Sequence, residues 1–417
     1  MDKFIINGGK ELNGTVRISG AKNAILPIMT ATILAQGKSV LTNIPHLNDI
    51  KMMAHLLRII GARVDYLDDK LEIDTTQCSY FEAPYELVSK MRASIYVLGP
   101  LLSRFGKAKV SFPGGCAIGT RPVDLHLKAM EKLGAKIKIE HGYINATVKK
   151  LNGTTIRFAN TSVGATANAL MASVKAKGDT VITNAALEPE IGSLIDFLNS
   201  MGGKITGKDS NTLKVSGVPE LHPAEMEMIP DRIETGTFLV AGAIAGGKII
   251  LENCNPNHLG TPLKLLSDVG CGLYISDDTI ELTAPETIKP VDIITKPYPG
   301  FPTDLQAQFM SLLSLADGES SIEEKIFPDR FMHVAELNRL DANIKVTKNI
   351  AQVKGSKKLS GAPVMATDLR ASAALVIAGL AAKGETVISR IYHIDRGYDR
   401  IEQKLQNLGA DIYRIQG

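Results

Sequence analysis

The amino-acid sequence predicts a two-domain α/β protein built from six repeated helix–strand–helix–hairpin units, three in each domain. Three observations lead to this fold class. The chain has 417 residues, which is too long for one ordinary core. A helix that ends in a glycine step and continues into an alternating strand recurs at a nearly constant period. Between its copies, an alanine-rich helix that ends near a glycine and continues into a β-branched strand also recurs.

The first pattern marks the second helix and hairpin of each unit. Its copies read LLRIIGARVDYL, MEKLGAKIKIE, LNSMGGKITG, LSDVGCGLYI, LNRLDANIKV and LQNLGADIYRI. The helix-ending positions, which by subtraction lie 73, 68, 68, 71 and 68 residues apart, are Gly61, Gly134, Gly202, Gly270, Asp341 and Gly409. Glycine at these positions is a helix C-cap signal, and aspartate is a tolerated exception. Because these helices carry charge on one face, we expect them to be exposed.

The second pattern marks the first helix of each unit. Its copies read AILPIMTATILAQGKSVLT, ASIYVLGPLLSRFGKAKVSF, ANALMASVKAKGDTVIT, GTFLVAGAIAGGKIIL, LQAQFMSLLSLADGESSI and ASAALVIAGLAAKGETVIS. These helices are apolar nearly all round, which indicates burial. Each domain is therefore expected to have central helices wrapped by sheets.

The sixth unit is short, because the chain stops at Gly417 after one strand. The N-terminal segment KELNGTVRISGAKN is similar to KKLNGTTIRFANTS, which precedes the third unit. We therefore expect residues 1–19 to complete the last unit, which places both termini in one domain. This predicts a domain of residues 20–229, which carries Cys116, and a domain of residues 1–19 and 230–417, which carries Asp304 and Arg396.

Composition narrows the function classes. The net charge is +3, from 47 basic and 44 acidic residues, which argues against a nucleic-acid partner. The four cysteines form no C-x-x-C pair and no zinc spacing, so we expect a reducing compartment, no metal and no cofactor. The first residues lack the apolar core of a signal peptide, and the longest apolar helical run, residues 371–382, is too short to cross a bilayer. We expect a cytoplasmic protein that does not contact the membrane.

Charged residues stand at the starts of helices that are otherwise apolar. If the helices run in parallel, their N-termini converge and attract anions. The residues at these starts are Lys22, Asn23, Asp49, Arg92, Arg121 to Asp124, Asp231, Arg232, Asp304, Arg330, Asp368 to Arg370, Asp395 and Arg396. Several arginines and one lysine suit a doubly anionic ligand. The alternative interpretation is structural: Asp49, Asp231, Thr303 and Asp368 are N-caps, and the arginines are salt-bridge partners.

Cys116 lies in the segment SFPGGCAIGTRPVDLH, on a glycine-rich loop before a helix start. The glycines allow the loop to move, while Arg121 and the helix N-terminus favour the thiolate form of Cys116. Cys78, Cys254 and Cys271 stand in strand-like or helix-ending contexts, where a thiol has no evident role.

Nine ordered motifs carry a family resemblance over essentially the whole chain. They are SGAKNA, MRAS, PGGCAIGTRPVDLH, SVGAT, PDRIETGTFLVA, FPTDLQAQF, RFMH, MATDLRAS and IYHIDRGYDRIE. Together they resemble the UDP-N-acetylglucosamine 1-carboxyvinyltransferases, the enolpyruvyl transferases that open peptidoglycan synthesis. The resemblance implies the enolpyruvyl transferase fold, in which each domain is an inside-out α/β barrel of three units. It also implies that the enolpyruvyl group of phosphoenolpyruvate is transferred to the 3′-hydroxyl of UDP-N-acetylglucosamine, with release of phosphate.

The resemblance also implies roles for individual residues. Lys22, Arg121 and Arg396 hold phosphoenolpyruvate, and Arg330 and Arg370 add positive charge. Asn23, Arg92 and Asp304 contact the sugar. The nucleotide site is lined by Arg121, Pro122, Val123, Asp124, Leu125, Ser162, Val163, Gly164 and Ile326. Asp304 is the expected general base and Cys116 the expected general acid. Two departures from the family are Asn160, where lysine is expected, and Pro328-Asp329, where Glu-Asn is expected.

Three alternatives stay open at this point. A 3-phosphoshikimate 1-carboxyvinyltransferase shares the fold and phosphoenolpyruvate but takes a small acceptor without a nucleotide. A catalytically silent paralogue acting as a regulator is a second alternative, although Lys22, Cys116, Asp304 and Arg396 are all in place. A ring-shaped DNA clamp is the third, but it needs a basic inner helix stripe, and here the first helices are apolar. We expect no obligate protein partner.

Overall fold

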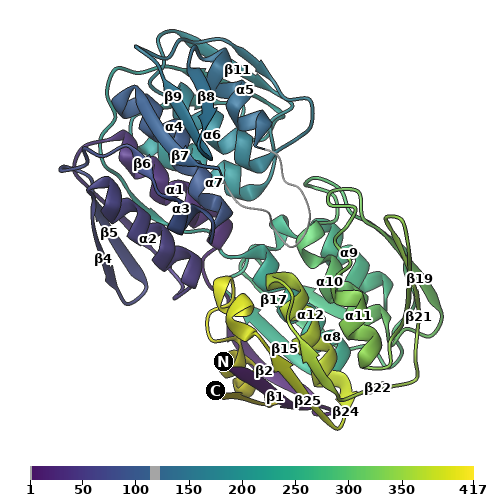
Figure 1. The fold of residues 1–417 in the computed structure, drawn as a ribbon. Coiled ribbons are helices and arrows are strands. Elements are labelled where there is room, and N and C mark those ends of the chain that lie inside the picture. The colour runs from purple at the N-terminus through teal and green to yellow at the C-terminus, as the bar shows by residue number, and fades with distance from the viewer. Residues whose placement is uncertain (1, 113–122) are drawn as a thin grey trace. The chain divides into compact units, whose positions relative to one another are not determined.

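The computed structural model describes residues 2–112 and 123–417. Residues 20–112 and 123–229 form one compact unit, domain A, and residues 2–19 and 230–417 form another, domain B (Figure 1). Within the described ranges, no helix is both long and apolar enough to cross a membrane.

Domain A contains three successive helix–strand–helix–hairpin units. The first comprises α1 (Lys22–Ala31), η1 (Thr32–Leu34), β3 (Lys38–Thr42), α2 (Asn48–Ile60), β4 (Arg63–Leu67) and β5 (Lys70–Asp74). The second comprises β6 (Glu82–Ala83), α3 (Tyr85–Val88), η2 (Arg92–Val97), α4 (Leu98–Phe105), β7 (Lys107–Ser111), α5 (Asp124–Lys132), β8 (Lys136–Glu140) and β9 (Tyr143–Thr147). The third comprises β10 (Thr155–Arg157), α6 (Val163–Ser173), β11 (Asp179–Thr183), α7 (Pro189–Ser200), β12 (Lys204–Thr206), β13 (Thr212–Ser216) and β14 (Glu225–Glu227).

Each unit of domain A builds one four-stranded sheet, and the three sheets have the same topology. Their strand orders are β14-β3-β5-β4, β6-β7-β9-β8 and β10-β11-β13-β12. In each sheet the first two strands are parallel and the other two pairs are antiparallel. The last strand of the domain, β14, joins the sheet of the first unit, so the ring of three units closes.

Domain B repeats this design. Its fourth unit comprises β2 (Leu12–Arg17), α8 (Arg232–Ala245), β15 (Gly247–Glu252), η3 (Pro256–His258), α9 (Gly260–Asp268), β16 (Gly272–Ile275) and β17 (Thr279–Thr283). The fifth comprises β18 (Ile293–Ile294), η4 (Thr303–Leu305), α10 (Gln306–Leu313), β19 (Glu319–Glu323), α11 (His333–Arg339), β20 (Asn343–Thr347) and β21 (Ile350–Lys354). The sixth comprises β22 (Leu359–Ser360), β23 (Pro363–Met365), α12 (Leu369–Ala381), β24 (Ala382–Lys383), β25 (Glu385–Ser389), η5 (Ile391–Arg396), α13 (Ile401–Asn407), β26 (Asp411–Ile415) and β1 (Lys3–Asn7).

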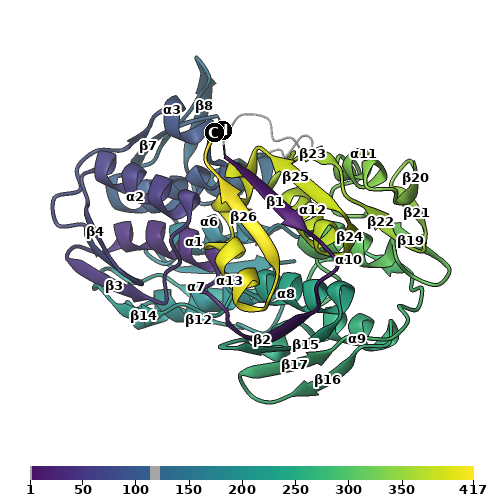
Figure 2. The same ribbon diagram turned by 90° about the horizontal axis from the view of Figure 1, so that it is seen from below.

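The N-terminal segment contributes to two sheets of domain B. Strand β1 pairs with both β25 and β26, and Figure 2 shows it beside β26 near the two chain ends. The expectation that this segment completes the sixth unit is therefore confirmed for β1. It is wrong for β2, which pairs in parallel with β15 of the fourth unit. The reason is the repeat itself, since β2 pairs in parallel with β15 of the fourth unit in the same way that β10 pairs with β11 of the third.

The two helix classes differ in burial as their sequence patterns predict, with α7 as an exception. The first helices are buried almost completely, and α6, α8, α10 and α12 expose few side chains. They are largely apolar, and some polar side chains that they bury, such as Thr237 and Gln308, are hydrogen-bonded inside the domain. The second helices α2 and α9 bury one face only, as expected, but α7 departs from this expectation because eight of its twelve residues are buried. All five predicted capping glycines have positive φ, and Asp341 adopts the same left-handed conformation with φ 66°. The predicted six-unit fold is confirmed.

Candidate functional site

Asp304 lies at the centre of a polar cluster in domain B. It sits in η4, at the start of the fifth unit's first helix. One carboxylate oxygen, Oδ1, lies 2.8 Å from Nη1 of Arg330, and the other, Oδ2, lies 3.2 Å from Nη2 of Arg370. The two arginine side chains are only 6% and 4% exposed, whereas that of Asp304 is 29% exposed. Asp304 thus presents an accessible carboxylate that two buried guanidinium groups hold in place.

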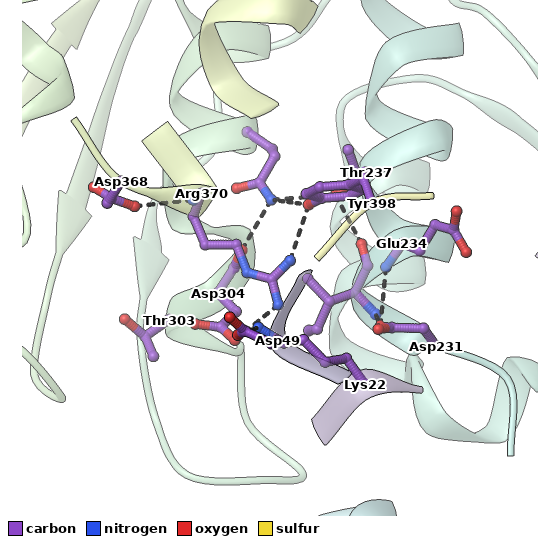
Figure 3. Close-up of polar contacts among 12 residues, drawn as sticks. Lys22, Asp49, Asp231, Glu234, Thr237, Thr303, Asp304, Asp368, Arg370 and Tyr398 are labelled. Atoms are coloured by element: carbon purple, nitrogen blue, oxygen red, sulfur yellow. Dashed lines mark hydrogen bonds and ion pairs between the residues drawn. The ribbon is translucent and has the colours of Figure 1, made fainter. Parts of the chain in front are cut away.

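Arg370 enters this cluster from the first turn of α12. The N-cap of this helix is Asp368, whose carboxylate accepts the backbone N–H groups of Arg370 and Ala371. Figure 3 shows the guanidinium of Arg370 between Asp304 and Tyr398, and its Nη1 donates to the Tyr398 hydroxyl at 3.0 Å. Burial alone opposes the charge of Arg370, but its neighbours, led by Tyr398 and Asp304, reverse this effect and raise its pKa. The arginine is therefore a permanent cation.

Arg330 is held from the opposite side. Its Nη1 also donates to the Thr303 hydroxyl at 3.0 Å, and that hydroxyl donates to the fully buried carboxylate of Glu324 at 2.9 Å. Glu324 also accepts the backbone N–H groups of Ile326 and Phe327. One buried carboxylate therefore fixes both the orientation of Thr303 and the turn that carries Ile326. Pro328 and Asp329, the departures noted above, follow this turn and are exposed.

Arg396 ends η5, before α13, and is partly exposed. Its neighbour Asp395 accepts two hydrogen bonds from Arg414 of β26, at 2.6 and 3.1 Å. Burial, followed by the charge of Arg396, lowers the pKa of His393 in the same segment. The last strand of the chain therefore anchors the segment that carries Arg396.

In domain A, Lys22 is the first residue of α1 and is 8% exposed. Its Nζ forms an ion pair with Oδ2 of Asp49, in the first turn of α2, at 3.1 Å. Burial and the positive end of the helix dipole both disfavour a lysine at this position. A single carboxylate therefore compensates a cation at the start of a buried helix, where an anionic ligand is also favoured. Asn23 follows Lys22 and is partly buried.

Within domain A, Gly164 of the expected nucleotide site contacts His126, the residue that follows the expected site segment 121–125. Gly164 packs so closely on the ring of His126 that an added Cβ would lie 3.0 Å from Cε1. His126 Nδ1 lies 2.8 Å from Nδ2 of Asn168, whose amide oxygen already accepts the N–H of Gly99. The amide nitrogen of Asn168 is thus the donor, and His126 Nδ1 accepts. Ser162 caps α6 by accepting the N–H of Ala165.

The remaining predicted residues of domain A lie as follows. Val123 is buried at the N-cap of α5, and Leu125 is partly buried. Asp124 begins α5 and forms an exposed ion pair with Lys128. Arg92 begins η2 and is partly buried, as is Val163 at the start of α6. Asn160, where the family resemblance implies lysine, is exposed.

Three predicted residues, Cys116, Arg121 and Pro122, lie outside the described residues. The structure brings together Asp304, Arg330 and Arg370, and separately Lys22 with Asp49. The structural alternative is correct for Asp231 and Asp368, which cap α8 and α12. It is wrong for Asp49 and Thr303, because neither is an N-cap.

Sequence reasoning missed four polar side chains that support these residues. They are His126, Thr237, Glu324 and Tyr398. His126 and Tyr398 are both buried, and they belong to two of the family motifs, RPVDLH and IYHIDRGYDRIE. Their place in these motifs is the sequence signal that could have identified them. Across residues 2–112 and 123–417, no group of three or more His, Cys, Asp or Glu side chains is placed to hold a metal ion.

Comparisons of this chain with known protein families and with individual proteins point to the same family. The family described as EPSP synthase (3-phosphoshikimate 1-carboxyvinyltransferase) matches residues 6–405. Proteins named UDP-N-acetylglucosamine 1-carboxyvinyltransferase are 54% identical to this chain in both Chloroherpeton thalassium and Geotalea uraniireducens. The alignment with the first covers 99% of this chain and 97% of the relative, and that with the second covers 100% of both.

Solved structures extend the comparison to the fold. The enolpyruvyl transferase NikO from Streptomyces tendae is 26% identical, with a TM-score of 0.91 over 100% of this chain and 99% of that one. EPSP synthase from Acinetobacter baumannii, at 17% identity and a TM-score of 0.77 over 100% of both chains, shares the fold. Since the family match and the relatives both extend over nearly the whole sequence, this chain belongs to the EPSP synthase family and, within it, to the UDP-N-acetylglucosamine 1-carboxyvinyltransferases.

Proposed function

We propose that this enzyme transfers the enolpyruvyl group of phosphoenolpyruvate to the 3′-hydroxyl of UDP-N-acetylglucosamine, the first committed step of peptidoglycan synthesis, in the cytoplasm. The observation that carries the proposal is Asp304, an accessible carboxylate held by two buried guanidiniums in a chain whose full-length relatives bear this activity in their names. Both substrates are anionic small molecules, and the proposal needs no nucleic acid, membrane or protein partner.

The reaction we propose is an addition followed by an elimination. Asp304 accepts the proton of the 3′-hydroxyl, whose oxygen attacks C2 of phosphoenolpyruvate while C3 gains a proton. The product of this step is a tetrahedral intermediate that still carries the phosphate. C3 then loses a proton, and the bond between C2 and the phosphate oxygen breaks. This releases phosphate and leaves the enol ether. A hydroxyl is a poor nucleophile at neutral pH, so a positioned base contributes about 10²–10⁴-fold.

The buried arginines supply the charge that this chemistry needs. Each terminal nitrogen of Arg370 carries two N–H groups, and one on each nitrogen is used by Tyr398 and Asp304. Within residues 2–112 and 123–417 the other two N–H groups form no hydrogen bond, so they can donate to an anionic oxygen. Fixed guanidiniums stabilise negative charge without reorganising during the reaction. We assign Lys22, Arg121 and Arg396 to phosphoenolpyruvate, with Arg330 and Arg370 adding positive charge.

The other assignments follow the family resemblance. Asn23, Arg92 and Asp304 contact the sugar, and residues 121–125, 162–164 and 326 line the nucleotide site. Cys116 delivers the proton to C3.

The test of the proposed function is phosphate release from phosphoenolpyruvate, measured with UDP-N-acetylglucosamine, with 3-phosphoshikimate and with neither. We expect phosphate release when UDP-N-acetylglucosamine is the acceptor, and no release with 3-phosphoshikimate or without an acceptor. The family description favours 3-phosphoshikimate as a second candidate acceptor, and release with that compound alone would establish it. Absence of release with either acceptor would indicate a silent paralogue.

The assignment of Asp304 is tested by Asp304→Asn. We expect turnover to fall by about 10²–10⁴-fold while UDP-N-acetylglucosamine still binds, because the amide keeps the shape of the side chain but accepts no proton. The matched control is Asp317→Asn, an exposed aspartate of the same domain, which should leave turnover unchanged. Normal turnover in Asp304→Asn with a lower melting temperature would mean that Asp304 is only structural.

A further inference from the structure

We propose that the hydroxyl of Tyr398 is a positioning group for this reaction, which keeps the guanidinium of Arg370 against Asp304. The inference rests on the proposed function, since it concerns the same carboxylate. Tyr398 is 2% exposed and lies in the segment between η5 and α13. It therefore acts through Arg370 from within the core of domain B.

The direction of each hydrogen bond in this cluster follows from proton counting. The hydroxyl of Thr237 lies 2.7 Å from the carbonyl oxygen of Ile233, one turn earlier in α8, and must donate its only proton there. The 2.8 Å contact between Thr237 and Tyr398 is then donated by the phenol. The phenol oxygen is left as the acceptor for Nη1 of Arg370, at 3.0 Å.

The resulting chain of donors runs from Arg370 through Tyr398 and Thr237 to a helix carbonyl. Every step has one direction, so the Arg370 guanidinium is offered an acceptor and not a competing donor. Burial, the largest effect, raises the pKa of Tyr398, so the phenol keeps the proton that it donates to Thr237. Because Arg370 and Tyr398 are both buried, water is a poor substitute for this acceptor.

The same cluster also holds the main chain of Asp304. Nε2 of Gln308 donates to the carbonyl oxygen of Asp304 at 2.9 Å and lies 3.2 Å from the Thr237 hydroxyl and 3.4 Å from the Tyr398 hydroxyl. The side chain and the backbone of Asp304 are therefore fixed by one network that joins α8, α10 and α12. Removing the phenol oxygen releases the guanidinium and leaves the ring that fills the core.

The test compares Tyr398→Phe with a matched loss of a buried hydroxyl, Ser311→Ala. Ser311 is fully buried in α10, and its hydroxyl donates to the carbonyl oxygen of Ala374 in α12 at 2.9 Å, so it links the same two helices. We expect Tyr398→Phe to lower kcat/KM for phosphoenolpyruvate by about 10- to 100-fold, because small displacements of catalytic groups have large kinetic effects. The Kd for UDP-N-acetylglucosamine should change less than about twofold. Ser311→Ala should lower the melting temperature and leave the kinetics unchanged.

A double variant shows whether Tyr398 acts through Arg370. In an Arg370→Lys background, where the planar fork is gone, Tyr398→Phe should lower kcat/KM by less than about twofold. Thr237→Val, which keeps the Tyr398 ring and removes the acceptor of its proton, should reproduce part of the effect. Thr237→Val also tests the inference if the Tyr398→Phe variant does not fold. Wild-type kinetics in both Tyr398→Phe and Thr237→Val, or a full independent effect of Tyr398→Phe in the double variant, overturns the inference.

A crystal structure of Tyr398→Phe gives a readout that does not depend on activity. We expect Nη2 of Arg370 to leave its 3.2 Å contact with Asp304. If the guanidinium of Arg370 does not move in this structure, the inference is overturned. This holds whichever substrate accepts the enolpyruvyl group. Failure of wild-type enzyme to release phosphate would contradict the proposed function and would leave this structural outcome to decide the positioning role.

Discussion

The three cysteines within the described residues are buried thiols that resist ionisation. Burial is the main cause, and it raises the pKa of Cys78 and Cys254 to about 11 and that of Cys271 to about 12. The thiolate is the reactive form of cysteine, so these three side chains are poor nucleophiles at neutral pH. Selective alkylation of this protein at pH 7 therefore depends on Cys116.

We predict that an epoxide phosphonate of the fosfomycin type alkylates Cys116 alone. Cys116→Asp should keep measurable turnover, since a carboxyl group still delivers a proton, but should resist inactivation because a carboxylate attacks epoxides poorly. Cys116→Ala should lose most turnover, because nothing replaces the acid. Intact-mass spectrometry after incubation with the inhibitor and UDP-N-acetylglucosamine measures the adduct. An adduct mapped to Cys78, Cys254 or Cys271, or full activity in Cys116→Ala, contradicts the assignment.

The aspartates of domain B show where residue-level prediction reaches its limit. Asp231, Asp304 and Asp368 all stand at the start of a first helix, and the sequence offers each the same two uses, N-cap or charge partner. Asp231 and Asp368 are caps, whereas Asp304 lies inside η4 and faces Arg330 and Arg370. The choice depends on a short 3₁₀ turn and on arginines distant in sequence, and neither has a local signal. The residue types of the site could be predicted from motifs, but their contacts could not.

At the scale of elements, the turn after β19 depends on one buried carboxylate. Glu324 is fully buried and accepts hydrogen bonds from two hydroxyls, those of Thr295 and Thr303, and from two backbone N–H groups. All four partners are donors. An amide in place of the carboxylate therefore turns one acceptor atom into a donor that faces other donors.

We predict that Glu324→Gln destabilises domain B by about 1–3 kcal/mol, the usual effect of leaving buried polar groups unpaired. The matched control is Glu323→Gln, which removes only an ion pair with the half-exposed Lys325 and should change stability by less than about 0.5 kcal/mol. Thermal unfolding measures both. Equal melting temperatures for the two variants would show that the turn does not depend on Glu324.

The contact between α5 and α6 is an element-scale source of acid sensitivity. Burial, more than the nearby Arg92, lowers the pKa of His126 to about 3. In the unfolded chain a histidine titrates near its usual pKa of about 6.5. Between these pH values only the unfolded state binds the proton, so this histidine stabilises the fold less and less as the pH falls below about 6.5. Above that value both states are neutral and its contribution is constant.

We predict that His126→Gln flattens the acid limb of the stability profile of domain A. One proton corresponds to a slope of about 1.4 kcal/mol per pH unit, which the glutamine removes because it gains no proton. Its amide oxygen can still accept from Asn168. Urea unfolding between pH 4.5 and 7.5 measures the slope, with the exposed His55→Gln as control. The same slope in His126→Gln and wild type contradicts the prediction.

At the scale of the whole molecule, the fold can be predicted from the sequence because the repeated unit occurs six times in it. Second helices that end in a left-handed residue, usually glycine, and largely apolar first helices recur in the units. A copy that departs from the pattern can therefore still be recognised from the other copies. Asp341 illustrates this, since its place in the repeat identified it as a helix end despite the missing glycine. The partner of β2 could not be predicted in this way. Strand pairing in a closed ring depends on which neighbour closes it, and that information is not local.

The two strands that correspond to a hairpin in the sixth unit, β26 and β1, are far apart in the sequence, whereas the hairpin strands of the other five units are consecutive. In the sixth unit β26 pairs with β1, with Ile415 opposite Lys3, just as β12 pairs with β13 in the third. Joining Gly417 to Met1 would connect β26 and β1 through residues 416, 417, 1 and 2. A loop of about four residues is a normal hairpin connection. The exposed residues 207–211 form the corresponding connection in the third unit.

We therefore predict that a circular permutant, with Gly417 fused to Met1 and new ends between Asp209 and Ser210, folds and keeps phosphate release within about tenfold of wild type. The new ends fall in an exposed turn, where cutting the chain leaves the sheet pairing intact. The matched control opens the same unit between Val181 and Ile182 of β11, a strand paired on both sides with β10 and β13. That variant should not fold. Circular dichroism and phosphate release measure both variants. If the first permutant is unfolded, or if the two variants behave alike, the sixth hairpin is not equivalent to the third and the six units are not interchangeable in the way that the repeat implies.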